Sequence, residues 1–303
     1  MATMTETPEA AATYTPSHQY HAEAHVLSGH LKRPIDQKIE KQAPALLNDR
    51  RGGHLTRYEN DFSIDGLISF TKGQTRVSGA RSLKTNGWVT ISTSILEGLN
   101  VLEIITAERM VSQVSTEHPY IDGHVPNVTF LGTQFKNLEV SGFPVKLKLD
   151  LGFCGARPAN GRSYLQDPNF LEKVRRQTED IAGARGLPKA LQEQYDEKLA
   201  YINQLISICD EGEAGGRDSI TCSLVQSIGE IPIPGVQSFG NILVIPEFGS
   251  VAIGEVEVGE NVYPDTPRAC VYFEVTNLKM KMGCVADGPA NAGSAKTNGQ
   301  SYP

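Results

Sequence analysis

The pattern of hydrophobic and polar positions predicts a protein built mainly of β-strands. Between residues 86 and 150, short runs rich in Val, Ile, Thr and Leu recur at intervals of roughly ten residues, separated by turn residues. In the clearest run, apolar and charged side chains alternate with the period of two that is typical of a strand with one buried face: Val145, Lys146, Leu147, Lys148, Leu149, Asp150 and Leu151. The pattern favours an antiparallel β-sandwich or a jelly-roll-like barrel.

A hairpin and two irregular strands are predicted from turn residues and from changes of phase. The dipeptide Asn86-Gly87 tolerates the positive φ angles of a tight turn, so residues 75–83 and 88–96 are expected to pair. Apolar residues change parity near Gly254 and again near Thr276. One extra residue near Gly254 would restore a continuous apolar face, and we predict a β-bulge there. The change near Thr276 indicates either another bulge or a strand that leaves one sheet and joins the other.

A helical insertion interrupts the strands at about residues 167–209. Asp167 can cap a helix that has Pro168 in its first turn, and Pro188 opens a second helix. The first helix has an apolar stripe at spacings of three and four residues: Phe170, Leu171, Val174, Thr178 and Ile181. We expect this helical pair to cover one face or edge of the sheet.

The domain organisation follows from composition. Residues 1–19 are rich in Thr, Pro, Ala and Glu and are predicted to form a flexible arm. Residues 20–285 form one β-rich domain that includes the insertion. Residues 286–303 consist largely of small residues and are predicted to form a flexible tail.

Net charge and the composition of individual segments indicate which kinds of partner and which cellular compartment are expected. A net charge of -7 without a basic stripe argues against a nucleic-acid partner. No segment is apolar and long enough to suggest membrane insertion, and the N-terminus lacks the features of a secretory leader, which favours the cytoplasm and leaves leaderless export open. Five cysteines without a Cys-x-x-Cys pair are expected to be free thiols; in an exported chain, Cys209 with Cys222 and Cys270 with Cys284 are the alternative pairs.

Several segments resemble a family of uncharacterised bacterial proteins of about this length. The similarity is carried, in this order, by TSILEGLNVLEIITAERMVSQVSTEHP, NVTFLGTQFKNLEVSGFPVKLKLDL, NILVIPEFGSVAIGEVEV and the final NGQSYP. It covers most of the chain from about Tyr20 onward. The resemblance implies a bacterial source and a shared fold, and it implies no activity, cofactor or binding residue.

Two groups of residues have the composition of a metal site. His21, Glu23 and His25 occupy alternate positions of a predicted strand and therefore point the same way, which suits two imidazoles on one ion. The second group lies on a loop between strands: Glu117, His118, Asp122 and His124. A solvated strand face and an ordinary polar loop are the competing interpretations. No cofactor is expected.

Aromatic side chains supply the candidate for ligand binding. Trp88 follows the predicted hairpin turn and could stack on a sugar ring, although a core anchor is the more common role. Three tyrosines would extend this surface if the fold brought them near: Tyr58, Tyr120 and Tyr164. Of these, Tyr120 is the one assigned with Trp88 to the candidate ligand site.

The sequence contains no recognisable catalytic or nucleotide-binding motif, and the functional expectations follow from this. No nucleophile elbow, Walker spacing or dinucleotide-binding spacing occurs, so an enzyme is less favoured than a non-enzymatic protein. The first expectation is a structural or self-assembling protein that forms homo-oligomers. The alternatives are a carbohydrate- or surface-binding module and a metal-dependent jelly-roll enzyme.

Overall fold

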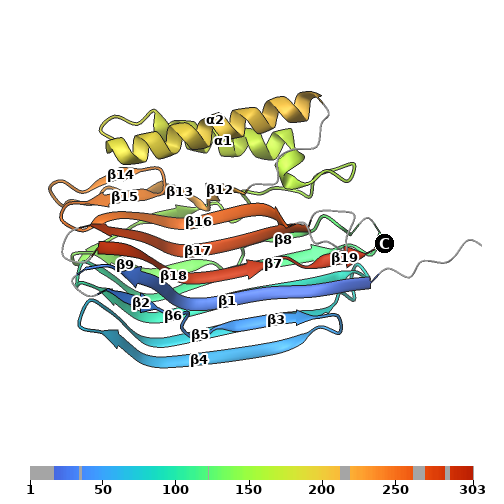
Figure 1. Ribbon diagram of the computed structural model, residues 1–303, viewed down its shortest axis with the longest axis horizontal. Helices are drawn as coiled ribbons and strands as arrows, with labels where there is room; N and C mark the ends of the chain where they lie inside the picture. The colour runs from blue at the N-terminus through green and yellow to red at the C-terminus, as the bar shows by residue number, and fades with distance from the viewer. Residues whose placement is uncertain are drawn as a thin grey trace, which may run out of the picture.

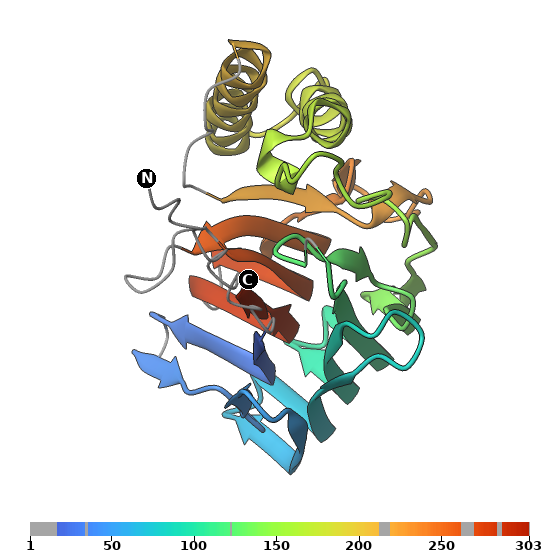
Figure 2. The same cartoon turned by 90° about the vertical axis from the view of Figure 1, so that its right-hand side faces the viewer.

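The computed structural model describes residues 17–33, 36–121, 123–211, 219–261, 270–283 and 287–302. Two antiparallel β-sheets lie face to face, and two helices lie along one side of them (Figures 1 and 2). At the opposite side the sheets approach each other, where β3 and β4 are in contact. The predicted fold class, a mainly β, sandwich-like protein with a helical segment, is confirmed.

The first sheet forms the front of the molecule in Figure 1. Its main strand order is β14-β15-β16-β17-β18-β1-β19, while β12 pairs with β16, and β2 and β3 pair with β1. Its ten strands within the described ranges are β1 (Ser17–Leu31), β2 (Gln37–Ile39), β3 (Ala45–Asp49), β12 (Ile220–Ser223), β14 (Gln237–Phe239), β15 (Ile242–Ile245), β16 (Gly249–Asn261), β17 (Cys270–Gly283), β18 (Asp287–Thr297) and β19 (Gln300–Tyr302).

The second sheet lies behind the first and has the order β10-β9-β7-β6-β5-β4, with β8 paired to β7. Its seven described strands are β4 (Gly53–Ile64), β5 (Ile68–Arg81), β6 (Trp88–Val101), β7 (Ile105–His118), β8 (Asn127–Thr129), β9 (Gln134–Val140) and β10 (Phe143–Pro144). A separate two-stranded sheet contains β11 (Leu147–Leu149) and β13 (Val225–Ile228). The regular alternation around Leu147 thus corresponds to a strand of only three residues.

The C-terminal segment is a central part of the first sheet. Strand β18 lies between β17 and β1, and β19 pairs with the first residues of β1. The prediction of a flexible tail is therefore wrong for residues 287–302. Small residues are required here because β18 faces the second sheet at short range, and Ala290, Ala292 and Ala295 are buried. Residues 1–16 lie outside the described ranges, and residues 17–19 belong to β1.

Hydrogen bonds join the two sheets directly across the interior. Side-chain hydroxyls of the second sheet donate to main-chain carbonyls of the first: Ser92 to Glu23, Ser94 to His25 at 2.9 Å, and Ser112 to Gly293 at 2.6 Å. These contacts require the sheets to approach closely. Apolar clusters at both ends of the long strands supply the remaining burial.

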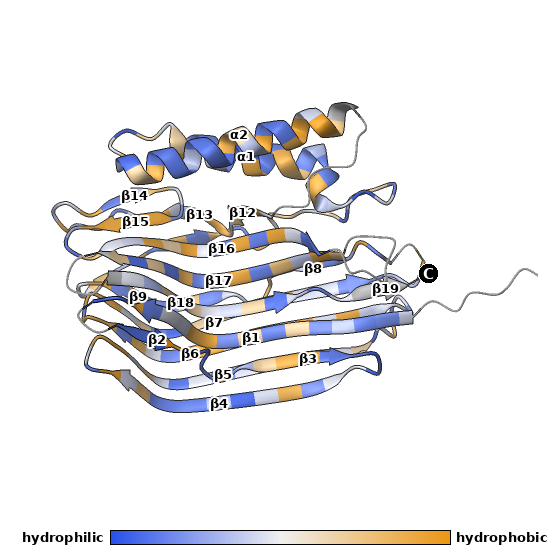
Figure 3. Cartoon of the chain, viewed as in Figure 1, coloured by the Kyte–Doolittle hydropathy of each residue, from blue (hydrophilic) through white to orange (hydrophobic). Residues whose placement is uncertain are grey.

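The long strands change their inward-facing side along one line that crosses both sheets. In β1 the buried hydrophobic positions are even-numbered up to Val26 and odd-numbered at Leu27 and Leu31. In β6 the buried positions, apart from Thr93, are even-numbered up to Leu96 and odd-numbered from Leu99. The strands bend near this line (Figure 1), and hydrophilic and hydrophobic segments alternate along them (Figure 3).

Left-handed residues on alternate strands produce this change. A positive φ reverses the pleat, and the paired neighbour must follow because directly opposite side chains share a face. The left-handed residues on the line, with their φ angles, are Asp61 (53°), Gly98 (66°), Asn137 (48°), Gly254 (59°) and Gly293 (67°).

The predicted β-bulge at Gly254 is wrong in form, and so are both alternatives near Thr276, because β17 has no bulge there and stays in the first sheet along its whole length. The pairing of β16 with β17 keeps its register on both sides of the line, with Ile253 opposite Leu278 and Glu255 opposite Thr276. No extra residue is inserted into either strand. The phase changes seen in the sequence are real, and the two strands make them together.

The helical insertion and the hairpin agree with the sequence-based predictions. Helices α1 (Pro168–Ala182) and α2 (Lys189–Glu211) pack on β12, β14 and β15, and the Asp167 side chain caps α1 as predicted. A 3₁₀ turn, η1 (Tyr164–Gln166), precedes α1. The β5–β6 hairpin contains Asn86 at a φ of 54°.

Because Gly98 is one of the left-handed residues at which the strands change their inward-facing side, its substitution is expected to destabilise the fold. Its substitution Gly98→Ala places a Cβ atom 2.4 Å from the Thr71 hydroxyl on a residue with a φ of 66°. We expect the free energy of unfolding, measured in urea, to fall by about 2–3 kcal/mol. The control Asp61→Gly removes side-chain strain at an equivalent position and should leave stability unchanged or raise it by up to about 1 kcal/mol. If the two substitutions changed the free energy of unfolding equally, the left-handed backbone at Gly98 would not be a requirement of the fold.

Candidate functional site

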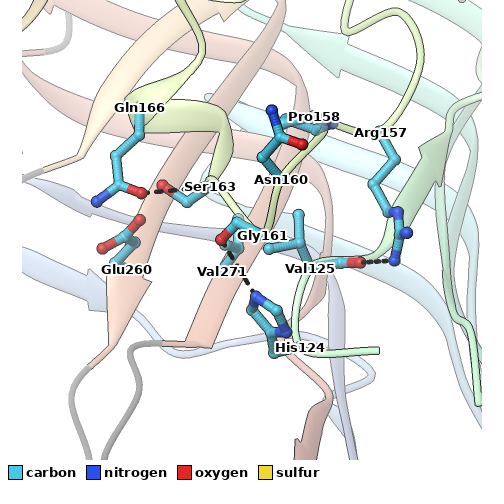
Figure 4. Close-up of a pocket in the computed structure, with 10 residues that line it drawn as sticks. All are labelled: His124, Val125, Arg157, Pro158, Asn160, Gly161, Ser163, Gln166, Glu260 and Val271. Atoms are coloured by element: carbon cyan, nitrogen blue, oxygen red, sulfur yellow. Dashed lines mark hydrogen bonds between the residues drawn. The ribbon is translucent and has the colours of Figure 1, made fainter. Parts of the chain in front are cut away.

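A polar hollow lies at the end of the sandwich where β16 ends and β17 begins. Its volume is about 670 Å³, within the range of small-molecule binding sites. Three separate parts of the chain line it, as Figure 4 shows: His124 and Val125; Arg157, Pro158, Asn160, Gly161, Ser163 and Gln166; and Glu260 with Val271.

Hydrogen bonds hold the walls of this hollow together. Nε2 of His124 lies 3.2 Å from the carbonyl oxygen of Gly161, and Arg157 donates to the carbonyl of Val125 at 3.5 Å. The Tyr164 hydroxyl donates to the carbonyl of Pro126 at 3.3 Å. The Tyr164 ring is buried edge-on against Phe273, so the wall is anchored to the core.

The lining offers hydrogen-bonding groups of several kinds. Arg157 is a cationic donor, Glu260 is an anionic acceptor, and Asn160 and Gln166 carry amides that both donate and accept. The backbone N–H of Ser163 donates to Oε1 of Gln166 at 3.2 Å. The Ser163 hydroxyl is buried and has no hydrogen-bond partner in the described structure.

A second hollow of about 510 Å³ adjoins the first. Arg157, Pro158 and Asn160 line both, so this short segment forms a ridge between them. Arg162 and Lys173 line the second hollow, and Asp167 is the acidic residue there. Cationic side chains thus outnumber anionic ones across the two hollows.

A buried aromatic and histidine cluster packs inside the same end of the sandwich. Trp88 and His118 are directly opposite each other on β6 and β7. His18 of β1 stacks on Trp88, with ring centroids 5.3 Å apart, and its ring centroid lies 4.8 Å from that of His118. Gly299 adjoins both imidazoles, and a Cβ there would lie 2.8 Å from Nε2 of His18.

The hydrogen bond of His118 fixes its tautomer. Its Nδ1 lies 2.5 Å from the carbonyl oxygen of Gly123, which can only accept, so Nδ1 carries the proton. Nε2 of the neutral ring is then an acceptor, and it has no hydrogen-bond partner in the described structure. Burial lowers the pKa of His118 to about 4. Burial, followed by the proximity of His118, lowers the pKa of His18 to about 2.

Trp88 and Tyr120, the predicted ligand-binding pair, are brought together. Their rings stack with centroids 5.8 Å apart, and the Arg81 guanidinium lies 5.1 Å from the Trp88 ring centre. Trp88 is only 4% exposed, because His18 also stacks on it. Tyr58 and Tyr164 lie elsewhere, on β4 and beside Phe273.

The strand set His21, Glu23 and His25 shares the outer side of β1, as predicted. His21 lies 3.0 Å from Glu23, and this hydrogen bond is the main cause that lowers the pKa of Glu23 to about 2. His25 is instead 2.9 Å from the hydroxyl of Ser28. The structure therefore pairs two of the three residues with each other.

The loop set is separated by the fold. Glu117 accepts hydrogen bonds from Ser82 and Thr85, whereas the neighbouring His118 points into the core. His124 lies in the polar hollow, and Asp122 lies outside the described residues. Within the described ranges, no three His, Cys, Asp or Glu side chains are grouped so that they could hold a metal ion.

Sequence reasoning missed most of the hollow. Of its lining, only His124 was among the predicted site residues, and His18 was not assigned to the cluster around Trp88. The segment that contains Arg157, Asn160 and Ser163 has no periodic pattern, and Glu260 is distant in sequence. A polar, glycine-containing stretch between a strand and a capped helix was the only available signal.

The structure also bears on the predictions of free thiols and of no membrane insertion. Within the described ranges, Cys154, Cys222 and Cys270 are free thiols, and the Cys209 thiol donates to the carbonyl of Leu165 at 3.8 Å. Neither α1 nor α2 is both long enough and apolar enough to cross a membrane, and no other described helix is.

Comparison with known protein families identifies a match over most of the chain. A family model described as a domain of unknown function (DUF8256) matches residues 18–259. No curated protein and no solved structure matches the chain. The expectation of an uncharacterised family is thereby confirmed.

The buried histidines predict a loss of stability on acidification. Their pKa values are lowered in the folded state, while an unfolded histidine titrates near 6.5. Their contribution is complete above pH 6.5 and is lost as the pH falls toward 4. His118→Asn should reduce the change in unfolding free energy between pH 7 and pH 5, measured in urea, by about 2 kcal/mol. His54→Asn, at an exposed position, is the control. If the change in unfolding free energy between pH 7 and pH 5 were the same in His118→Asn as in the wild type, the prediction would be refuted.

Proposed function

The chain belongs to this family of unknown function, and we propose that it is a non-enzymatic β-sandwich module that binds a saccharide in the polar hollow. The observation that carries the proposal is the convergence of donors and acceptors from three separate segments on one hollow of suitable size. Proteins recognise small ligands with a few well-placed polar groups on a largely preformed surface.

The polar groups match a polyhydroxylated ligand. Each sugar hydroxyl both donates and accepts, and the amides of Asn160 and Gln166 can satisfy both roles. The carboxylate of Glu260 and the guanidinium of Arg157 provide stronger, charge-assisted bonds. Because cationic groups prevail across the adjoining hollows, saccharides that carry a carboxylate should bind more tightly than neutral ones.

The ligand would be held by hydrogen bonds rather than by stacking on Trp88. Trp88 is covered by His18, Tyr120 and Arg81 and does not line the hollow. Exposing its ring would require the end of the sandwich to open. Trp88 and Tyr120 therefore support the site from inside, as packing residues, in this proposal.

A non-enzymatic role is supported by the surroundings of the buried Ser163 hydroxyl in the lining of the hollow. An activated serine requires a base within hydrogen-bond reach. In the described structure, the Ser163 hydroxyl has no such partner. Self-assembly, the first expectation from the sequence, is a separate proposal that concerns a different surface, strand β4.

Substitution of Glu260 tests the saccharide proposal. Screening of the whole chain on an array of neutral and acidic glycans, followed by calorimetric titration of the best ligand, should give saturable binding. Glu260→Ala should weaken this binding at least ~10-fold, because a charge-assisted hydrogen bond contributes about 1.5–3 kcal/mol. Glu197→Ala, on the exposed side of α2, is the matched control. The absence of glycan binding, or binding that is insensitive to Glu260→Ala, would refute the proposal.

A further inference from the structure

Strand β4 is the long free edge of the second sheet. It pairs with β5 on one side, and no described strand pairs with its other side. It has twelve residues, whereas β10, β14 and β19, at the other ends of the two strand orders, have two or three. The unpaired N–H and C=O groups of such an edge can accept a further strand.

In the middle of β4, side chains are accessible on both faces of the strand. Arg57 and Tyr58 are consecutive and therefore point to opposite faces, yet both are exposed, and Tyr58 has an exposed fraction of 59%. In β5, by contrast, buried positions recur throughout. The middle of β4 is thus accessible at the bottom of the molecule in Figure 1, while another part of the strand contacts β3.

Symmetry restricts how two copies of this edge can pair. Two antiparallel edge strands form one continuous sheet when the two-fold axis is perpendicular to it, and each side chain then stays on its own face. The residue on the axis is directly opposite itself. A register centred on Arg57 or on Glu59 would bring like charges together and is disfavoured.

The register centred on Tyr58 brings opposite charges together. It places Arg57 of one copy directly opposite Glu59 of the other, and it does so twice because of the symmetry. Within the described structure, neither Arg57 nor Glu59 forms a salt bridge in its own chain. The two tyrosines at the axis meet on the opposite face and contribute an aromatic cross-strand pair.

We propose that two copies of the chain associate through antiparallel pairing of their β4 strands, centred on Tyr58. The two second sheets then form one continuous sheet of fourteen strands, seven from each copy. The charge complementarity of β4 with itself identifies the partner as a second copy. The saccharide hollow lies on residues outside β4, so this interface does not depend on ligand binding.

Charge reversal tests the interface and its register together. The whole chain should behave as a dimer in size-exclusion chromatography with light scattering. Arg57→Glu puts like charges opposite each other in both pairs and should raise the dimer Kd at least ~10-fold. The double variant Arg57→Glu with Glu59→Arg restores opposite charges and should restore dimerisation.

Each alternative outcome overturns the proposal. A wild-type chain that stays monomeric up to high micromolar concentration shows that β4 does not pair. A dimer that Arg57→Glu leaves intact uses another surface, and failure of the double variant to recover rejects the Tyr58 register. Circular dichroism of the three proteins verifies that the substitutions leave the fold intact, and Lys72→Glu on β5 controls for a general effect of charge.

Discussion

The close approach of the two sheets is the constraint on which the rest of the structure depends. Three serine hydroxyls of the second sheet reach main-chain carbonyls of the first, which is possible only because alanine and glycine occupy the facing positions of β1 and β18. These bonds satisfy buried polar groups that would otherwise destabilise the core. They also fix the relative position of the sheets more tightly than apolar contacts would.

This fixed position determines the geometry at the end of the sandwich. Trp88 and His118 sit at the ends of β6 and β7, and His18 reaches them from the first sheet. The cluster closes the interior behind the loops that carry His124 and Arg157. Because the loops are bonded to one another and to buried Tyr164, the hollow is formed before any ligand arrives.

The sequence predicted elements well where the signal was local. The Asp167 cap, the helical stripes and the Asn86-Gly87 turn depend on neighbouring residues, and the structure contains all three features. The phase change at Gly254 was visible in the sequence, but its form, a reversal that β16 and β17 make together without a change of register, could not be predicted because it is a property of adjacent strands. The composition of residues 287–302 suggested disorder, since the partners that make small residues necessary there are almost the whole chain away. The hollow was missed for the same reason: Glu260 meets Asn160 only in space.

The pairing of β1 with β18 has a consequence for how the protein is made. Strand β1 leaves the ribosome well before β18, the strand that completes its hydrogen bonds, because most of the described chain lies between them. Until β18 has been translated, β1 therefore exposes an unpaired edge and an apolar face that contains Ala22 and Ala24, and such surfaces favour aggregation of nascent chains. The first sheet can be completed only after residues 287–302 have been translated, so the topology requires β1 to remain unaggregated until then.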